Sequence, residues 1–421
     1  MKRGSDTPIL LGNSAPMART FNASAPDFET RFSRFLGEQR ADGHDVGGIV
    51  AKILDEVEVR GGEAVARYTA QFDELQIDPT TLQSDNVDLA ALAADCPADL
   101  KAAIDFAHDR IAAYHSAQRP ADHSFTDEAG VELGVDRIVM VAPAPKGEMS
   151  PAVAYAALRA GVDEFYPLGG AQAVGALAFG AGRLAPVDKI VGPGNAFVAE
   201  AKRQVFGRVG IDTIAGPSEI LVIADETANP DWIAADLLSQ AEHDPSSQSI
   251  LITVNEAVGR AVDNAVDKQL KTLATGERAA RSWSTHGAII FVADLDQAAT
   301  IANRIAAEHV ELAVADPDAM LPKIRHAGAV FLGHHTPEAL GDYVTGSNHV
   351  LPTSRAARFS SGLGLYDFLK RMSVQRASPE GFAALAPAAL RLAEAERLPA
   401  HARSISIRSN AVQDSGTGDD G

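Results

Sequence analysis

The alternation of short apolar runs with amphipathic segments after Pro120 most strongly constrains how this chain can fold. Each repeat of the pattern has a run rich in branched residues, a turn with Gly or Pro, and a segment with helical spacing of apolar residues. Strands that alternate with helices form a parallel sheet with helices on both faces. The predicted strands are 130–134, 137–142, 164–168, 189–191, 219–224, 249–254, 288–292, 311–314 and 329–332. Because these are too many for one small domain, we predict an α/β fold with two Rossmann-like doubly wound halves.

The rest of the chain is expected to surround these two halves. Apolar spacing predicts N-terminal helices, with a break at Gly61 and Gly62, and a small helical segment near the C-terminus. The predicted parts are a flexible N-terminus (1–26), a helical region packing on the second α/β half (27–120), a first α/β half (121–217), a second α/β half (218–363), a C-terminal helical segment (364–408) and a disordered tail (409–421).

Composition limits the classes of function. The formal net charge of -19 argues against nucleic acid as a partner, because binding phosphates requires clustered Lys and Arg. The single cysteine, Cys96, excludes an internal disulfide and a Cys-rich metal cluster, and it fits a reducing compartment. No signal-peptide core and no apolar stretch of roughly twenty residues is found, so we expect a cytoplasmic protein without membrane contact.

The segment 236–244, DLLSQAEHD, is the first candidate for a functional site. Gln240 and His243 are three residues apart, so they lie on one face of the predicted helix. An amide oxygen and an imidazole form half of a zinc site, which needs three or four ligands. A histidine beside a polar residue is more often a surface or hydrogen-bonded core residue, and this pair alone leaves both interpretations open.

Two predicted turns between a strand and a helix suggest a ligand site. Gly169 and Gly170 precede Gln172, and the sequence Gly-Pro-Gly at 192–194 precedes Asn195. Glycines let a ligand approach the backbone, and a helix N-terminus offers free N–H groups to an anion. The alternative is a tight turn with Asn195 as the helix cap.

Charged and polar residues also gather later in the chain. Glu308 and His309 are adjacent where a helix meets a strand, and together they can supply a general acid and a general base. Asp342 and His349 lie in a segment rich in Gly, Ser and Asn, which is typical of the wall of a site. By themselves Glu308 and His309 are equally well explained as a helix-terminal charge and its partner.

Seven motifs, in this order and spacing, resemble the histidinol dehydrogenase family, and the resemblance extends from about residue 187 to residue 408. They are VDKIVGPGNAFVAEAKRQVFGRVGIDTIAGPSEILVIADE, DLLSQAEHDPSSQSILIT, AAEHVELAVADP, AGAVFLG, TPEALGDYVTGSNHVLPTS, ARFSSGLGLYDFLKR and ERLPAHARSISIR. The resemblance implies a zinc enzyme that oxidises L-histidinol to L-histidine through the aldehyde, with two NAD, in the last step of histidine biosynthesis.

The resemblance also implies roles for individual residues. His309 is expected to take the hydroxyl proton and Glu308 to activate a water. The expected zinc ligands are Gln240, His243, Asp342 and His401; the expected substrate contacts are Ser218, Gln240, His243, His309, Asp342, His349, Glu396 and His401; and the expected NAD contacts are Gln172 and Asn195. In the family the site is shared by two subunits, so the C-terminal segment is expected to form a homodimer in which His401 and Glu396 complete the site of the partner subunit.

One departure from the family is large. Between GVELG (130–134) and DRIVMVAPAP (136–145) the family carries another strand, a Tyr-Val-Pro-Gly-Gly turn and a helix. About one βα unit, roughly thirty residues long, is therefore absent near residue 135, and with it the family's Tyr against NAD. We expect the first half to lose a strand from the middle of its sheet, and NAD binding to be weakened or abolished while the metal site stays intact.

Two other functions remain open from the sequence. A paralogous zinc and NAD dehydrogenase acting on another small alcohol would keep the metal ligands but differ around the substrate. Ser218, His349 and Glu396 all match the biosynthetic pattern, which ranks this alternative second. The missing unit also allows a cofactor-defective, non-catalytic homologue.

Overall fold

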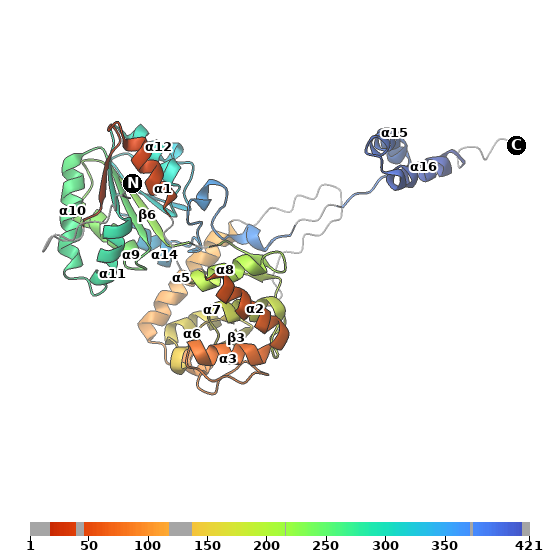
Figure 1. Cartoon of the computed structure of the whole chain (residues 1–421), viewed down its shortest axis with the longest axis horizontal. Coiled ribbons are helices and arrows are strands. Elements are labelled where there is room, and N and C mark those ends of the chain that lie inside the picture. The colour runs from red at the N-terminus through yellow and green to blue at the C-terminus, as the bar shows by residue number, and fades with distance from the viewer. Residues whose placement is uncertain (1–16, 39–45, 118–136, 215, 371–373, 415–421) are drawn as a thin grey trace, which may run out of the picture. The chain divides into compact units, whose positions relative to one another are not determined.

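The computed structural model describes residues 17–38, 46–117, 137–214, 216–370 and 374–414. Contacts between residues divide the chain into two units (Figure 1). One unit contains the described residues up to Phe368, and the other contains the described residues from Leu369 onward. The first unit holds two α/β halves, so the predicted α/β class is confirmed.

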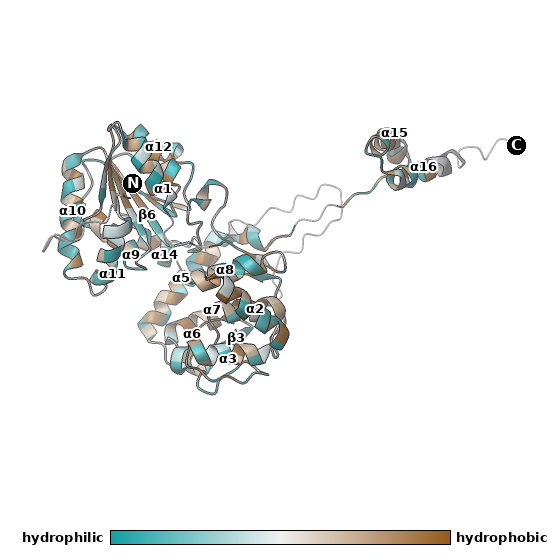
Figure 2. Cartoon of the chain, viewed as in Figure 1, coloured by the Kyte–Doolittle hydropathy of each residue, from teal (hydrophilic) through white to brown (hydrophobic). Residues whose placement is uncertain are grey.

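A six-stranded parallel sheet forms the second α/β half (Figure 1). Its strands, in spatial order, are β1 (Arg19–Asn22), β8 (Ala288–Phe291), β7 (Gln248–Thr253), β6 (Glu219–Ala224), β9 (His309–Ala313) and β10 (Ala329–Leu332). All residues of β6 are buried, because its run EILVIA is covered on both faces (Figure 2). From β8 to β10 the order is that of a doubly wound fold, in which β6 is the first strand and β9 lies across the switch in direction.

Helices cover both faces of this sheet. On one face α9 (Pro230–Ala241), α10 (Glu256–Leu270) and α11 (Gly276–His286) pack in one apolar core, and on the other face α1 (Phe28–Gly37) and α12 (Leu295–Ile305) pack in a second core. Asn229 begins α9, because its side chain accepts hydrogen bonds from the backbone N–H groups of Asp231 and Trp232. Pro230 is the first residue of the helix, where a backbone N–H group would have no partner within the helix. This start fixes α9, which carries Gln240, on the sheet.

The N-terminal strand β1 was not predicted. Residues 19–22 pair in parallel with β8, and Phe21 packs against Phe32 and Phe35 of α1. The expectation of a flexible segment 1–26 therefore does not hold for residues 19–22, because pairing with β8 and the phenylalanine contacts hold them in place. Residues 1–16 lie outside the described part of the chain.

The first α/β half is built largely from helices. Its helices are α2 (Gly47–Arg60), α3 (Gly62–Phe72), α4 (Leu89–Ala94), α5 (Ala98–Ser116), α6 (Pro151–Arg159), α7 (Gly170–Phe179) and α8 (Ala196–Val205). Gly61, with φ of 53°, separates α2 from α3 as expected. Helix α2 packs closely on α7, where Gly175 leaves room for Leu54 and Val57. Region 27–120 thus differs from the prediction, since α1 packs on the second half whereas α2 and α3 share the core of the first.

The strands of the first half form two separate pairs. Strands β2 (Val139–Val141) and β3 (Glu164–Tyr166) pair in parallel, and so do β4 (Lys189–Ile190) and the unpredicted β5 (Gly210–Ile211). Among the described residues no ladder joins the two pairs. In a doubly wound order, the first strand lies between the second and the fourth. A gap between β2 and β4 is therefore what the loss of the first βα unit should leave.

The remaining elements are short or lie near the C-terminus. They are α13 (Pro317–Met320), α14 (Glu338–Tyr343), α15 (Pro379–Ala395), α16 (Pro399–Asp414) and 3-10 turns at Pro145–Gly147, Leu321–Lys323, Ala356–Arg358 and Leu365–Phe368. The predicted strand at 130–134 and the predicted tail beyond residue 414 lie outside the described residues. None of the described helices is long and apolar enough to pass through a membrane.

Candidate active site

The candidate site lies at the amino ends of β6 and β9, because Glu219 begins the first strand and His309 begins the second. Helix α9 runs back across the sheet, so its C-terminal end, with Gln240, returns to this edge. Asp342 comes from α14, which follows β10. Four separate elements therefore bring polar side chains to one edge of the second half.

His309 is the most buried imidazole of this group, with 1% of its surface exposed. Its Nδ1 lies 2.9 Å from the backbone carbonyl oxygen of Glu219. A carbonyl only accepts hydrogen bonds, so Nδ1 carries the proton and Nε2 of the neutral ring is left as an acceptor. Burial lowers the pKa of His309 to about 4, although the negative charge of Asp342 acts to raise it. The ring is therefore neutral near pH 7, with its basic nitrogen available.

Glu219 and Glu308 fix the backbone around this histidine. The backbone N–H of Glu219 donates to Oε2 of Glu308 at 3.0 Å, and the backbone N–H of Glu308 donates to Oε2 of Glu219 at 3.3 Å. Oε1 of Glu219 accepts a third hydrogen bond from the backbone N–H of Ser354 at 3.1 Å. Both carboxyl groups are almost fully buried, so these bonds join β6, β9 and the loop after α14 that carries Ser354.

Asp342 and His349 form a hydrogen-bonded pair at the entrance. Nδ1 of His349 lies 2.9 Å from Oδ1 of Asp342, which is itself 3.7 Å from Nε2 of His309. Burial acts to raise the pKa of Asp342, but the hydrogen bonds from His349 and Glu338 outweigh it and lower the pKa. The same hydrogen bond raises the pKa of His349, against partial burial. The pair favours a carboxylate beside a half-exposed imidazolium.

Glu338 stands behind Asp342 on the same face of α14, one turn earlier. It is 2% exposed, its Oε2 accepts a hydrogen bond from the hydroxyl of Ser239 at 3.1 Å, and its Oε1 lies 3.8 Å from Nε2 of His309. Ligand atoms of His309, Glu338 and Asp342 all lie within 4.8 Å of one another. Burial, followed by the hydrogen bond with Asp342, raises the pKa of Glu338 to about 8, so this carboxyl group holds a proton at neutral pH.

The predicted helix pair is placed at the same edge. Gln240 is 1% exposed, and its Oε1 has no hydrogen-bond partner among the described residues. His243 follows α9, is exposed, and donates its backbone N–H to the carbonyl of Gln240 at 3.2 Å. It is near enough to His309 for its charge to lower the pKa of that ring. A buried amide oxygen without a partner requires an explanation, and a bound cation supplies one.

Of the other predicted substrate residues, Ser218 is half-buried and directly precedes β6. Glu396 and His401 are exposed and belong to the second unit, at the end of α15 and in α16. Of the predicted substrate residues, only Glu396 and His401 lie in the second unit. Ser218, Gln240, His243, His309, Asp342 and His349 all lie in the first unit.

The predicted NAD contacts lie in the first half. Gln172 is 1% exposed, and its Oε1 has no hydrogen-bond partner among the described residues. Asn195 caps α8, because its Oδ1 accepts from the backbone N–H groups of Phe197 and Val198 at 3.1 and 3.2 Å. The capping alternative for Asn195 is therefore present, and the cap uses only the side-chain oxygen of this residue.

The donor atoms fit a zinc ion. Zinc binds imidazole nitrogen and carboxylate or other oxygen ligands, and a catalytic site leaves one position for substrate. Among the expected ligands, Oε1 of Gln240 is buried and has no hydrogen-bond partner among the described residues. Together with the Asp342 carboxylate and the His243 imidazole, it offers oxygen and nitrogen donors with one negative charge, a set that a divalent cation would bind.

The fold and the site define an α/β protein with a neutral buried histidine, a paired carboxylate and a donor set suited to a divalent cation. Titratable groups with shifted pKa values that meet in this way are typical of the active site of an enzyme.

Comparisons with known proteins agree with this class. A sequence model of histidinol dehydrogenase matches residues 37–134 and 131–409. The histidinol dehydrogenase of Caulobacter vibrioides is 53% identical, with 93% of this chain and 99% of that protein covered, and that of Ruegeria pomeroyi is 49% identical with the same coverage. The crystal structure of histidinol dehydrogenase from Elizabethkingia anophelis matches with a TM-score of 0.83 and 29% identity, covering 95% of this chain and 99% of that one. The chain belongs to the histidinol dehydrogenase family and is an oxidoreductase of that family.

The comparisons also bear on the missing unit. The family match is interrupted at residues 131–134, where the sequence predicts that a βα unit is absent. The alignment with the Caulobacter vibrioides protein spans 425 positions, whereas 93% of this 421-residue chain is about 392 residues. About 33 aligned positions thus have no residue in this chain, close to the size of one βα unit.

Two functional residues were missed by the sequence analysis. Glu219 and Glu338 each contribute a buried carboxyl group to the site. Glu219 opens an otherwise apolar strand run, and a charged residue at that position is unusual enough to have marked it. Glu338 lies four residues before Asp342, on the same face of a helix, which is the signal that would have found it.

Replacing Asp342 by Asn should lower the pKa of His349 toward its ordinary value, because the carboxylate charge is lost. The pKa of His349 is higher in the folded protein than in the unfolded chain. Below the unfolded pKa the pair therefore contributes its full stabilisation of the fold, and this contribution disappears as the pH rises through the folded pKa. The lowered pKa of Asp342 means that its own contribution is full only above 3.8, so the stability of zinc-free D342N protein should fall most between pH 3.8 and pH 6.5, where both groups of the wild-type pair are charged. NMR titration of the histidine rings measures the shift, and an unchanged pKa for His349 would contradict the pairing.

Proposed function

We propose that this chain oxidises L-histidinol to L-histidine through the aldehyde, using zinc and two NAD, as the last step of histidine biosynthesis. The family assignment supports the reaction, because relatives that align over 99% of their length are named histidinol dehydrogenase. The observation that carries the proposal is the buried His309 ring, whose Nδ1 is engaged with Glu219 while Nε2 faces Asp342.

His309 acts as the base in the first oxidation. Removing a hydride from an alcohol carbon requires the hydroxyl proton to leave, and Nε2 of the neutral ring accepts it. The developing imidazolium lies 3.7 Å from the Asp342 carboxylate, which stabilises its charge. NAD, held by residues such as Gln172 and Asn195, would supply the hydride acceptor. For the second oxidation, the resemblance assigns Glu308 the task of activating a water that attacks the aldehyde.

Gln240, His243 and Asp342 of one subunit, with His401 of the partner subunit, would hold the zinc ion. When bound, zinc would supply a Lewis acid that polarises the substrate hydroxyl and orients its nitrogen atoms. Ser218, His349 and Glu396 would contact the substrate. Enclosure at this buried edge favours retention of the reactive aldehyde between the two oxidations.

A homodimer would complete the site. Helices α15 and α16 pack on each other but leave Leu385 and Leu392 each 66% exposed. Large exposed apolar side chains on a helix pair favour burial against another surface. A second copy of the chain is the occupant that the resemblance implies, with His401 and Glu396 reaching the partner's site.

NAD binding is proposed to be weaker than in relatives that keep the missing unit. The two strand pairs of the first half are not joined among the described residues, and the family's Tyr has no equivalent here. Gln172 and Asn195 remain as cofactor contacts. The second half, which holds the metal site, has its own complete sheet, so zinc binding should be retained.

Two alternatives rest on the same features. A paralogous dehydrogenase would oxidise a different small alcohol, and a cofactor-defective homologue would bind zinc without turnover. The matches at Ser218, His349 and Glu396 favour histidinol over another alcohol.

The absence of a candidate membrane span among the described helices fits a cytoplasmic location, which we propose for this chain.

NADH formation from L-histidinol with added zinc tests the proposed reaction directly. We expect two NADH per histidine in the wild type, and loss of both zinc and turnover in His243→Asn, because one of the ligands is removed. His108→Asn, on α5 and outside the site, is the matched control. Turnover only with another alcohol would indicate the paralogue, and zinc uptake without any turnover would indicate the non-enzyme. Full zinc content in H243N would show that the ligand set is wrong.

Mixed dimers test whether two subunits share a site. H243N and His401→Asn should each abolish zinc binding and activity alone. In a mixture, a hybrid dimer has one site with both defects and one site with neither, so about a quarter of wild-type activity should return in a random mixture. Activity is measured after the subunits exchange. Failure to recover any activity, with hybrid dimers demonstrated, would mean that His401 serves its own subunit.

Restoring the missing unit tests the cofactor defect. The βα unit of the Caulobacter vibrioides relative, inserted between Gly134 and Asp136, should join the two strand pairs and raise NAD affinity by roughly tenfold or more, with zinc content unchanged. NAD titration by calorimetry measures the change, and a Gly/Ser insertion of equal length is the control. Equal NAD affinity with and without the unit would refute the proposed defect.

A further inference from the structure

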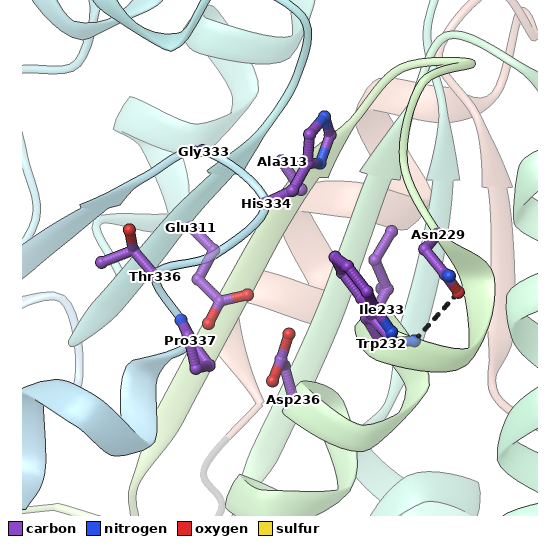
Figure 3. A pocket seen from close by; sticks show the side chains of 10 residues that line it. All are labelled: Asn229, Trp232, Ile233, Asp236, Glu311, Ala313, Gly333, His334, Thr336 and Pro337. Carbon is purple, nitrogen blue, oxygen red and sulfur yellow. Dashed lines mark hydrogen bonds between the residues drawn. The ribbon is translucent and has the colours of Figure 1, made fainter.

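A second group of carboxyl residues lies behind the site, at a small pocket between α9 and the carboxyl ends of β9 and β10. Figure 3 shows the carboxyl groups of Asp236 and Glu311 facing each other across this pocket, with Pro337 beside them. Glu311 is 4% exposed and Asp236 is half-buried. Neither residue belongs to the predicted ligand, substrate or catalytic set.

The two carboxyl groups are hydrogen-bonded, which requires one proton between them. Burial raises the pKa of Asp236 to about 6, and burial together with the nearby charge of Asp236 raises the pKa of Glu311 well above its ordinary value. The hydrogen bond raises the pKa of Glu311 and lowers that of Asp236, so Glu311 is the donor of the pair and Asp236 the acceptor.

Glu311 also reaches the start of α14. Its Oε1 accepts a hydrogen bond from the backbone N–H of Glu338 at 2.7 Å. An acceptor at this position satisfies one of the free N–H groups in the first turn of a helix and fixes where that helix begins. Asp342 lies one turn further along α14, so its position follows from this contact.

The pair therefore joins three of the four elements that carry the site within the first unit, namely α9, β9 and α14. Asp236 lies one turn before Gln240 on the same face of α9. Glu311 lies two residues after His309 and projects from the same face of β9. The contact with Glu338 adds α14 and, through it, Asp342.

We propose that the hydrogen-bonded Asp236–Glu311 pair is a positioning device that holds α9, β9 and α14 in the spacing that the zinc site requires. The inference rests on the proposed function of that site. Neither residue touches the ion or the substrate, and both act through Gln240, His309 and Asp342. Outer residues of this kind usually change metal affinity by ten- to a hundredfold when they are removed.

Conservative and disruptive variants separate hydrogen bonding from bulk packing. Glu311→Gln keeps an oxygen for the N–H of Glu338 and an NH2 group for Asp236. Glu311→Leu and Asp236→Leu replace the carboxyl group by an apolar side chain and so break the pair. Zinc affinity of the full-length chain is measured by chelator competition. We expect a roughly tenfold or greater loss in E311L and D236L, and a change of less than about threefold in E311Q.

Asp263→Leu is the matched control. Burial raises the pKa of Asp263 too, but it lies on α10, and the groups that act on it, Asp267 and Trp283, belong to α10 and α11. This variant should leave zinc affinity unchanged whatever it does to the melting temperature. A loss of zinc affinity in D263L equal to that in D236L would overturn the proposal, because it would reflect general destabilisation.

Amide hydrogen exchange of residues 337–343 provides a readout without zinc. E311L should increase exchange of this segment, because the acceptor for the N–H of Glu338 is lost, and E311Q should not. Wild-type zinc affinity and unchanged exchange in E311L would overturn the proposal. If the wild type takes up no zinc, the proposed function fails, and the exchange result alone then decides whether the pair positions α14.

Discussion

The hydrogen bond between the His309 ring and the backbone carbonyl of Glu219 is the constraint on which the site depends. It joins the first residues of two neighbouring strands, β6 and β9, and it selects which ring nitrogen carries the proton. The reciprocal backbone bonds of Glu219 and Glu308 hold the same two strand ends together. If this connection were lost, Nε2 of His309 would no longer have a fixed direction toward Asp342.

The site occupies an unusual edge of its fold. Doubly wound sheets generally bind ligands outside the carboxyl ends of their strands, at the switch in strand order. In this half that position is the small pocket at which Asp236 and Glu311 meet (Figure 3). The buried histidine and its carboxylate partners lie at the amino ends instead, where the C-terminal end of α9 arrives. A polar contact at one edge can therefore set the geometry of a site at the other.

The separation of the two halves explains how a missing βα unit can leave the histidine cluster in place. The unit would belong to the first half, whose strands form two unconnected pairs in the described chain. Every strand contact around His309 belongs to the second half, from β1 to β10. The proposed defect is therefore confined to the cofactor side, since no strand of the metal side depends on the lost segment.

Much of the second half could be predicted from the sequence, because it contains continuous runs rich in branched residues such as those at β6 and β7. The four-residue strand β1 was missed, since its pattern is too short to distinguish from a loop and its order comes from β8. The spacing of apolar residues predicts the helices α2 and α3, but it does not reveal whether they pack in the core of the first half or of the second. At the site, motifs identified His309, Asp342 and Gln240. Glu311 and Asp236 were missed because their role depends on a contact between distant segments.

The ring nitrogens of His309 provide the most direct measurement, because their protonation tests both the hydrogen bond to Glu219 and the burial of the ring. Nitrogen-15 NMR of the histidine side chains in zinc-free protein, with H309N for assignment, reports the tautomer and the pKa. We expect a neutral ring with the proton on Nδ1 throughout the neutral range, titrating at about 4. A proton on Nε2, or titration at the ordinary histidine value of 6.5, would contradict the proposed base.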